Sequence, residues 1–167
     1  SDYAQRCLSV ENEDKPNGYD IAHTIELAQR IPIRCTLDTH HYACHRMVET
    51  EKVKMGEKTV NRKVRDVDHI THTDDYFREA VKSWRSVRPL FHKSQSFHPE
   101  NPDYWMKPNA HSETYWDEEL MARHVPMLEY ADFDVEAKFK EVAVQGFYKF
   151  IKDEEEFAGE EIKTKTF

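Results

Sequence analysis

Four carboxylate or imidazole side chains stand at the ends of short strand-like segments that are spread along the whole chain. The clearest case is Asp38, which directly follows the β-type segment Ile33-Arg34-Cys35-Thr36-Leu37 and precedes His41 by three positions. Carboxylates and imidazoles at successive strand ends are how a β/α barrel builds a metal site, because its strand ends converge at one rim. The pattern therefore predicts a metal centre. The four strand-end residues are Glu11, Asp38, His92 and Glu136.

Each of these residues also has a plainer interpretation. Asp38 could be a helix N-cap followed by solvent histidines, and His92 could be a hydrogen-bonded core histidine. Glu136 could be a first-turn glutamate that the helix dipole stabilises. Glu11 could belong to an acidic surface run over 11–14. Of the other histidines, His40 and His45 are expected next to the metal ligands or on the surface.

Size and composition limit the fold and the class of partner. The chain has 167 residues, of which 34% are charged and 38% hydrophobic, which suits one modest core. A complete eight-stranded β/α barrel needs about 250 residues, so a full barrel does not fit. The formal net charge is −8, which argues against a general nucleic-acid binder. The ten histidines exceed what a solvated surface needs.

Cysteine usage and hydropathy indicate a cytoplasmic protein without a membrane segment. Cys7, Cys35 and Cys44 form no C-x-x-C pair, which favours free thiols in a reducing compartment. No apolar run approaches about 18 residues, and no secretory leader pattern is visible. A strand-like segment close to Ser1, which is not a Met, favours the interpretation that this chain was cut from a longer one.

The elements that must position these residues alternate between strand and helix. Four strand–helix units predict an α/β fold with a parallel sheet and crossover helices, in one domain over 1–167. The gaps from Asp38 to His92 and from His92 to Glu136 exceed the roughly 30 residues of a lean unit, so the loops after those strands carry insertions. The expected elements are strand 5–11, loop 12–19, helix 20–30 with Asp20 as N-cap, strand 33–38, an irregular excursion 39–73, helix 74–86, strand 88–92, loop 95–112, short helix 117–123, strand 131–136 and helix 137–156.

Four units make about half of a barrel of the TIM type. An isolated half would expose two unpaired parallel edges and half of the inner layer. We therefore expect a missing N-terminal segment, a second polypeptide or a symmetry mate to complete the barrel.

Five segments resemble motifs of the UV damage endonucleases, in the same order as in that family. Leu37-Asp38-Thr39-His40-His41 resembles the family's D-x-H-H strand end, and Asp132–Lys138 resembles its terminal DFD-V…EAK signature. The other segments are Leu8–Asp14 (LENDD), Pro89–Ser94 (K-x-H-x-S) and Ala110-His111 with Tyr115 (H-A-D-Y). The resemblance covers nearly the whole chain but only the C-terminal half of a family member, which is a TIM barrel of the group that contains endonuclease IV and xylose isomerase.

The resemblance implies a metal-dependent DNA repair endonuclease that cuts 5′ of a UV photoproduct or similar lesion, leaving a 3′-hydroxyl and a 5′-phosphate. Two or three divalent ions (Mn²⁺, Zn²⁺, Mg²⁺ or Fe²⁺) would neutralise the phosphate oxygens and lower the pKa of a bound water. The family's ligands in this half fall on Glu11, Asp38, His41, His92, His111 and Glu136. All but His111 are also assigned as catalytic. His98 is a competitor for the place of His111, and Asn12, Thr39 and Ser94 are expected to hold the imidazoles.

Two features depart from the family pattern. Leu90 stands two positions before His92, where the family has Lys. The terminal signature is two residues shorter, and aligning it on Glu136 leaves the register of Asp134 open. The alternatives are accordingly an abasic-site endonuclease or sugar isomerase of the same barrel group, and an inactive fragment or assembly subunit.

DNA contact is expected from two segments that would lie over the active face of a barrel. Between Arg46 and Arg65 seven Lys or Arg oppose three Glu, a net charge of +4, which suits phosphate contacts. The loop 95–112 carries aromatic residues that could stack on unpaired bases of damaged double-stranded DNA. A solvated hairpin and a small satellite core are the plainer alternatives. The expected DNA-binding residues are Lys52, Lys54, Lys58, Arg62, Lys63, Tyr104 and Trp105.

Overall fold

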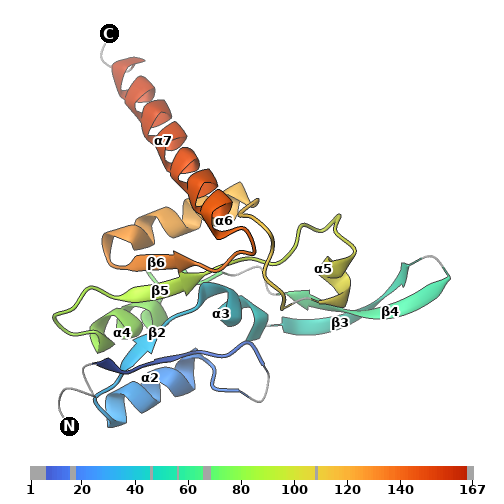
Figure 1. Ribbon diagram of the computed structural model, residues 1–167, viewed down its shortest axis with the longest axis horizontal. Helices are drawn as coiled ribbons and strands as arrows, with labels where there is room; N and C mark the ends of the chain where they lie inside the picture. Colours follow the sequence, from blue (N-terminus) through green and yellow to red (C-terminus); the bar gives the residue numbers. More distant parts are fainter. Residues whose placement is uncertain are drawn as a thin grey trace.

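Short parallel strands run side by side through the centre of the molecule (Figure 1). β1 pairs with β2 and β5 pairs with β6, both in parallel, with Phe91 opposite Phe133 in the second pair. The two pairs meet at an isolated parallel bridge between Asp38 and His92. The strand order is therefore β1–β2–β5–β6, and the predicted alternation of parallel strands with helices is confirmed. The strands are β1 (Ser9–Glu11), β2 (Arg34–Thr36), β5 (Leu90–Lys93) and β6 (Asp132–Val135).

This computed structural model describes most of the chain. Its backbone is described over residues 7–15, 18–45, 47–55, 57–65, 69–107 and 109–164. Within those ranges the side chains are described except at 47–53, 55, 58, 60–65, 105–106 and 155–164.

One face of the sheet packs against two helices, α2 (Ile21–Arg30) and α4 (Asp75–Ser83). The helix α2 begins where predicted, because Asp20 accepts a hydrogen bond from the His23 backbone N–H at 2.9 Å. The core between them contains side chains from the sheet and from both helices. Its members include Cys35, Leu37, Phe91, Ile21, Ile25, Phe77 and Trp84.

A second core lies beyond β6 and is closed by the C-terminal helices. Buried members include Tyr115, Leu120, Val135 and Phe147. Lys93 is also buried here, and burial lowers the pKa of its amino group to about 7. In Figure 1 the long helix α7 projects away from the rest of the molecule. The elements are α6 (Glu118–His124), the 3-10 helix η1 (Val125–Glu129) and α7 (Lys140–Thr164).

The excursion over 39–73 is not irregular, and this expectation was wrong. It contains helix α3 (Thr39–His45) and an antiparallel hairpin of β3 (Met47–Met55) and β4 (Lys58–Arg65). The many charged residues of this segment obscure the sequence signal for a hairpin. That signal consists of β-branched residues on both sides of a Gly-Glu step at 56–57. A further short helix, α5 (Asp103–Met106), lies within the expected loop 95–112.

The last helix begins later than the expected residue 137. The Lys138 and Phe139 backbone N–H groups donate to the carbonyls of Ser112 and Glu113, so this stretch is tied to a neighbouring loop before the helix starts at Lys140. The helix also continues past 156. Among the described residues, no helix has the length and apolar character to cross a membrane. Cys7, Cys35 and Cys44 are free, as expected.

Candidate metal centre

Asp38 sits at the carboxyl end of β2. One of its two carboxylate oxygens accepts backbone hydrogen bonds, and the other has no hydrogen-bond partner among the described residues. Its Oδ1 accepts hydrogen bonds from the His40 and His41 backbone N–H groups, each at 2.7 Å, so the N-cap interpretation is correct for that oxygen. Its backbone is held by Asn12, whose side chain accepts from Asp38 N at 2.8 Å and donates to Asp38 O at 3.0 Å. The Oδ2 atom is buried and has no hydrogen-bond partner among the described residues.

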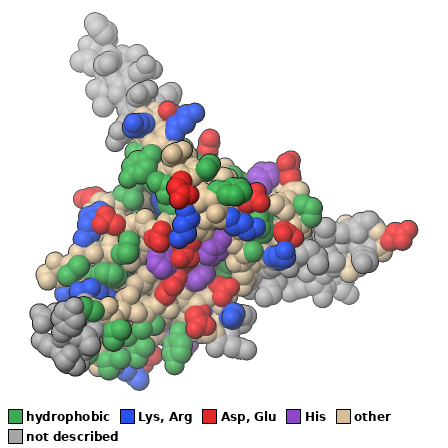
Figure 2. All heavy atoms as spheres, in the orientation of Figure 1, with side chains coloured by type: hydrophobic (Ala, Val, Ile, Leu, Met, Phe, Trp, Pro, Cys, Tyr) green, Lys and Arg blue, Asp and Glu red, His purple; other side chains and the backbone are tan. Residues whose placement is uncertain are grey.

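Glu11, His92 and Glu136 approach Asp38 from the ends of three other strands. The distance from His92 Nδ1 to Glu11 Oε1 is 3.0 Å, and that from His92 Nδ1 to Glu136 Oε1 is 3.5 Å. One potential ligand atom from each of these residues and from Asp38 lies within 4.8 Å of the others. The parallel strands place their carboxyl ends at one edge, and this brings together groups that are far apart in sequence. Figure 2 shows histidine and acidic side chains grouped near the middle of the visible face.

Two further histidines lie at the margin of this cluster. His41 Nδ1 is 3.5 Å from Glu11 Oε1, and His111 Nδ1 is 3.8 Å from Glu136 Oε2. His41 Nδ1 also lies 2.8 Å from the Asn12 carbonyl oxygen. A carbonyl only accepts, so Nδ1 donates there and Nε2 is left with the lone pair that a metal ligand requires. All six residues expected as ligands thus lie at one end of the sheet.

The electrostatics of the cluster favour a bound cation. Burial raises the pKa of Asp38. Burial alone would also raise the pKa of Glu11, but the hydrogen bond with His92 and the neighbouring imidazole charges overcome it and lower that pKa. The same hydrogen bond raises the pKa of His92. Three carboxylates and an imidazole, with one buried carboxylate oxygen unpartnered, are a donor set that fits a divalent metal ion.

Of the three residues expected to form hydrogen bonds with the imidazoles, one does so. Asn12 holds both Asp38 and His41, whereas the Thr39 and Ser94 hydroxyls make no hydrogen bond within the described residues. No sequence pattern indicated Ser96, whose Oγ lies 3.0 Å from Nε2 of the buried His40. Ser96 also forms an antiparallel bridge with His111, so it links two histidines at the site.

The two departures from the family pattern have structural consequences. Leu90 is 46% exposed and lies two positions before His92 on β5, so the two side chains share a face. Asp134 is paired in register with His92, but its carboxylate contacts Lys140 at 3.9 Å and stays outside the cluster. Glu136 is the residue that enters the cluster, in agreement with an alignment on that position.

Only part of the expected DNA-binding set can be placed. Lys54 is exposed on β3, and Tyr104 is half-buried on α5. The hairpin follows directly after α3, whose first turn Asp38 caps, and Figure 1 shows the hairpin extending to one side of the parallel strands. The side chains that lie outside the described residues are those of Lys52, Lys58, Arg62, Lys63 and Trp105.

Among known proteins, the chain is similar to a solved structure. No protein-family model matches the chain, and no curated protein does. The fold is similar to the crystal structure of SacUVDE, a UV damage endonuclease, with a TM-score of 0.59 and 21% sequence identity. The match covers 87% of this chain and 39% of SacUVDE, so the chain spans well under half the length of that protein. The resemblance seen in the motifs is thereby confirmed at the level of the fold.

Proposed function

We propose that this chain is the C-terminal, metal-binding part of a DNA repair endonuclease that cuts the phosphodiester 5′ of UV photoproducts or similar lesions. The observation that carries the proposal is the convergence of Glu11, Asp38, His92 and Glu136 at the carboxyl ends of parallel strands. The same strand ends carry the motifs that resemble the UV damage endonucleases, and the fold is similar to SacUVDE.

In this proposal Glu11, Asp38, His92 and Glu136 hold a divalent cation, and His41 and His111 extend the site toward further ions. When bound, divalent ions would neutralise the phosphate oxygens and make a water nucleophilic near neutral pH. The residues of the protein hold the metal ligands in position. Asn12 fixes Asp38 through two backbone hydrogen bonds and orients the His41 ring, so two ligands are set by one side chain.

The substrate in this proposal is damaged double-stranded DNA. The sequence of the hairpin over 47–65 has a surplus of Lys and Arg, and such residues would contact phosphates. Tyr104 and Trp105 on α5 would stack on bases that the lesion has unpaired. A cytoplasmic location accords with the three free thiols.

The remaining part of the barrel is also part of the proposal. In the described chain β1 and β6 each pair on one side only, so four strands form an open sheet. A missing N-terminal segment, a second chain or a symmetry mate would pair with these edges and cover Leu90 and its neighbours. The 39% coverage of SacUVDE supports this view.

Leu90 favours one rival, a chain that binds metal but does not cut DNA by itself. The family's Lys at that position is replaced here by a side chain without a charge or a donor. An abasic-site endonuclease or a sugar isomerase would use the same ligand types, and only the substrate separates them from the first proposal.

The test measures metal and cleavage separately. Manganese bound after dialysis is quantified for the chain and for Asp38→Ala and Glu136→Ala, with Asp134→Ala as a matched control outside the cluster. End-labelled irradiated, abasic and plain duplexes are then assayed for nicks that carry a ligatable 3′-hydroxyl. We expect metal binding that the first two variants lose and the control retains, and nicking of irradiated duplex only. Failure to bind metal even with a barrel-completing half supplied would refute the metal site, and nicking of abasic duplex alone would reassign the substrate.

A further inference from the structure

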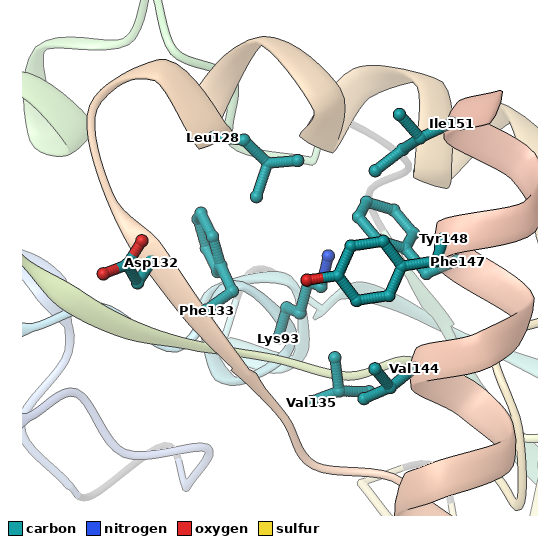
Figure 3. Close-up of a pocket in the computed structure, with 9 residues that line it drawn as sticks. All are labelled: Lys93, Leu128, Asp132, Phe133, Val135, Val144, Phe147, Tyr148 and Ile151. Carbon is teal, nitrogen blue, oxygen red and sulfur yellow. The ribbon is translucent and has the colours of Figure 1, made fainter.

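A cavity lies on the face of β5 and β6 that is opposite to the His92 side chain. It has a volume of about 300 Å³ and is bounded by β5, β6, η1 and α7. Adjacent residues of a strand point to opposite faces, so His92 faces the metal centre and Lys93 faces this cavity. Figure 3 shows the Lys93 amino group pointing into the space between the surrounding apolar side chains.

The lining of this cavity combines one buried amino group, that of Lys93, with apolar walls. Leu128, Val135, Val144 and Ile151 supply the aliphatic surface, and Phe133 and Phe147 supply aromatic rings. In Figure 3 the Tyr148 ring reaches across the space. The volume is at the lower end of the range for small-molecule sites, and mixed apolar walls with a single charged group are typical of such sites.

Lys93 is 1% exposed, yet among the described residues it takes part in no ion pair with a carboxylate. The acidic side chain at the cavity rim, Asp132, is engaged by Arg88 at 2.7 Å. The Lys93 amino group instead lies over the Phe147 ring, 3.0 Å from its centroid, with the Phe133 ring at 5.4 Å. Aromatic faces offset only part of the hydration that an ammonium group gives up on burial, so an anion at this point would be strongly favoured.

We propose that this cavity, defined by Lys93 and the apolar side chains of β6, η1 and α7, binds a small apolar monocarboxylate. The carboxylate would accept a charge-assisted hydrogen bond from Lys93, and the hydrocarbon part would replace water between Val144, Phe147 and Ile151. The ligand class follows from the two features together. An apolar neutral molecule would leave the Lys93 amino group without a partner of opposite charge, and the apolar walls would disfavour a polyanion.

The test uses octanoate as the probe and octanamide as its neutral isostere. Binding to the whole chain is measured by calorimetry, and its location by shifts of the Val144 and Ile151 methyl resonances. Octanoate is expected to bind the native chain and to shift both methyl groups. Lys93→Met keeps the length and apolar stem of the side chain, and it should weaken octanoate binding by at least about tenfold without weakening octanamide.

Two further variants complete the design. Val144→Trp fills the cavity from α7 and should abolish octanoate binding while Lys93 stays in place. Lys82→Met removes an exposed lysine of α4 that pairs with Glu79, and it should bind octanoate as the native chain does. Equal octanoate affinity in native and Lys93→Met chains, or no binding at all, would overturn the proposal. So would a dimer that Val144→Trp dissociates, since a second copy would then occupy the cavity.

Discussion

Asp38 and His92 lie opposite each other across an isolated parallel bridge, and this bridge joins the two halves of the sheet at the candidate metal centre. The His92 backbone N–H donates to the Leu37 carbonyl oxygen at an N···O distance of 2.9 Å. The bridge aligns the end of β2 with β5. The Asp38 carboxylate and the His92 imidazole are therefore close to each other. Backbone pairing therefore fixes the geometry of the side-chain cluster.

Asp38→Asn should have opposite effects on the metal-free and the metal-bound chain. The amide oxygen can still cap α3, while the buried charge on the other side is removed. The metal-free chain should gain stability, by about 1–3 kcal/mol in the free energy of unfolding, because a buried carboxylate close to Glu11 and Glu136 becomes neutral. Affinity for Mn²⁺ should fall by about 10–100-fold. Chemical denaturation with and without Mn²⁺ measures both effects, and a variant destabilised to the same extent in both conditions would show that Asp38 is a structural cap alone.

Glu11→Gln should lower the pKa of His92. The hydrogen bond with Glu11 is the main cause that raises this pKa, and a neutral amide supplies no opposing charge. Proton resonances of the imidazole, followed against pH in the metal-free chain, give the value directly. Glu13→Gln is the matched control, because Glu13 lies outside the cluster. An unchanged His92 titration in Glu11→Gln would mean that the two side chains are not in contact in solution.

The candidate site was more predictable from the sequence than the fold around it. Asp38 and Glu136 each follow a β-forming segment. In a β/α fold the carboxyl ends of the strands lie at one edge of the sheet, so a metal-binding residue type at such a position indicates a site. The roles of Asn12 and Ser96 depend on contacts with residues distant in sequence, which no local pattern encodes. Lys93 was missed for a different reason, because a lysine inside a strand is ordinarily taken as solvent-facing. The hairpin was missed because charged residues at most positions obscure the alternation that signals a strand.

His124→Gln should reduce the loss of stability in mild acid. His124 is 1% exposed, and burial holds its pKa well below the usual value. The unfolded chain therefore binds a proton near pH 6.5 that the folded chain does not, and stability falls as the pH drops through that value. The wild-type curve of unfolding free energy against pH should be steeper than that of the variant by up to about 1.4 kcal/mol per pH unit. His98→Gln, at an exposed position, is the matched control. Parallel curves for His124→Gln and the wild type would contradict the buried neutral imidazole.

Lys52→Gln with Lys54→Gln should weaken DNA binding and lower its dependence on salt. Both residues lie on β3, and removing one phosphate-binding lysine should reduce the slope of log affinity against log salt by about 0.9. The matched control is Lys149→Gln with Lys152→Gln, which removes the same charge from exposed positions on α7. Fluorescence anisotropy of irradiated duplex at several salt concentrations provides the slopes. If both double variants lower the slope equally, the effect reflects net charge and the hairpin has no special part in DNA contact. If only the hairpin variant does so, the hairpin of β3 and β4 contacts the DNA backbone.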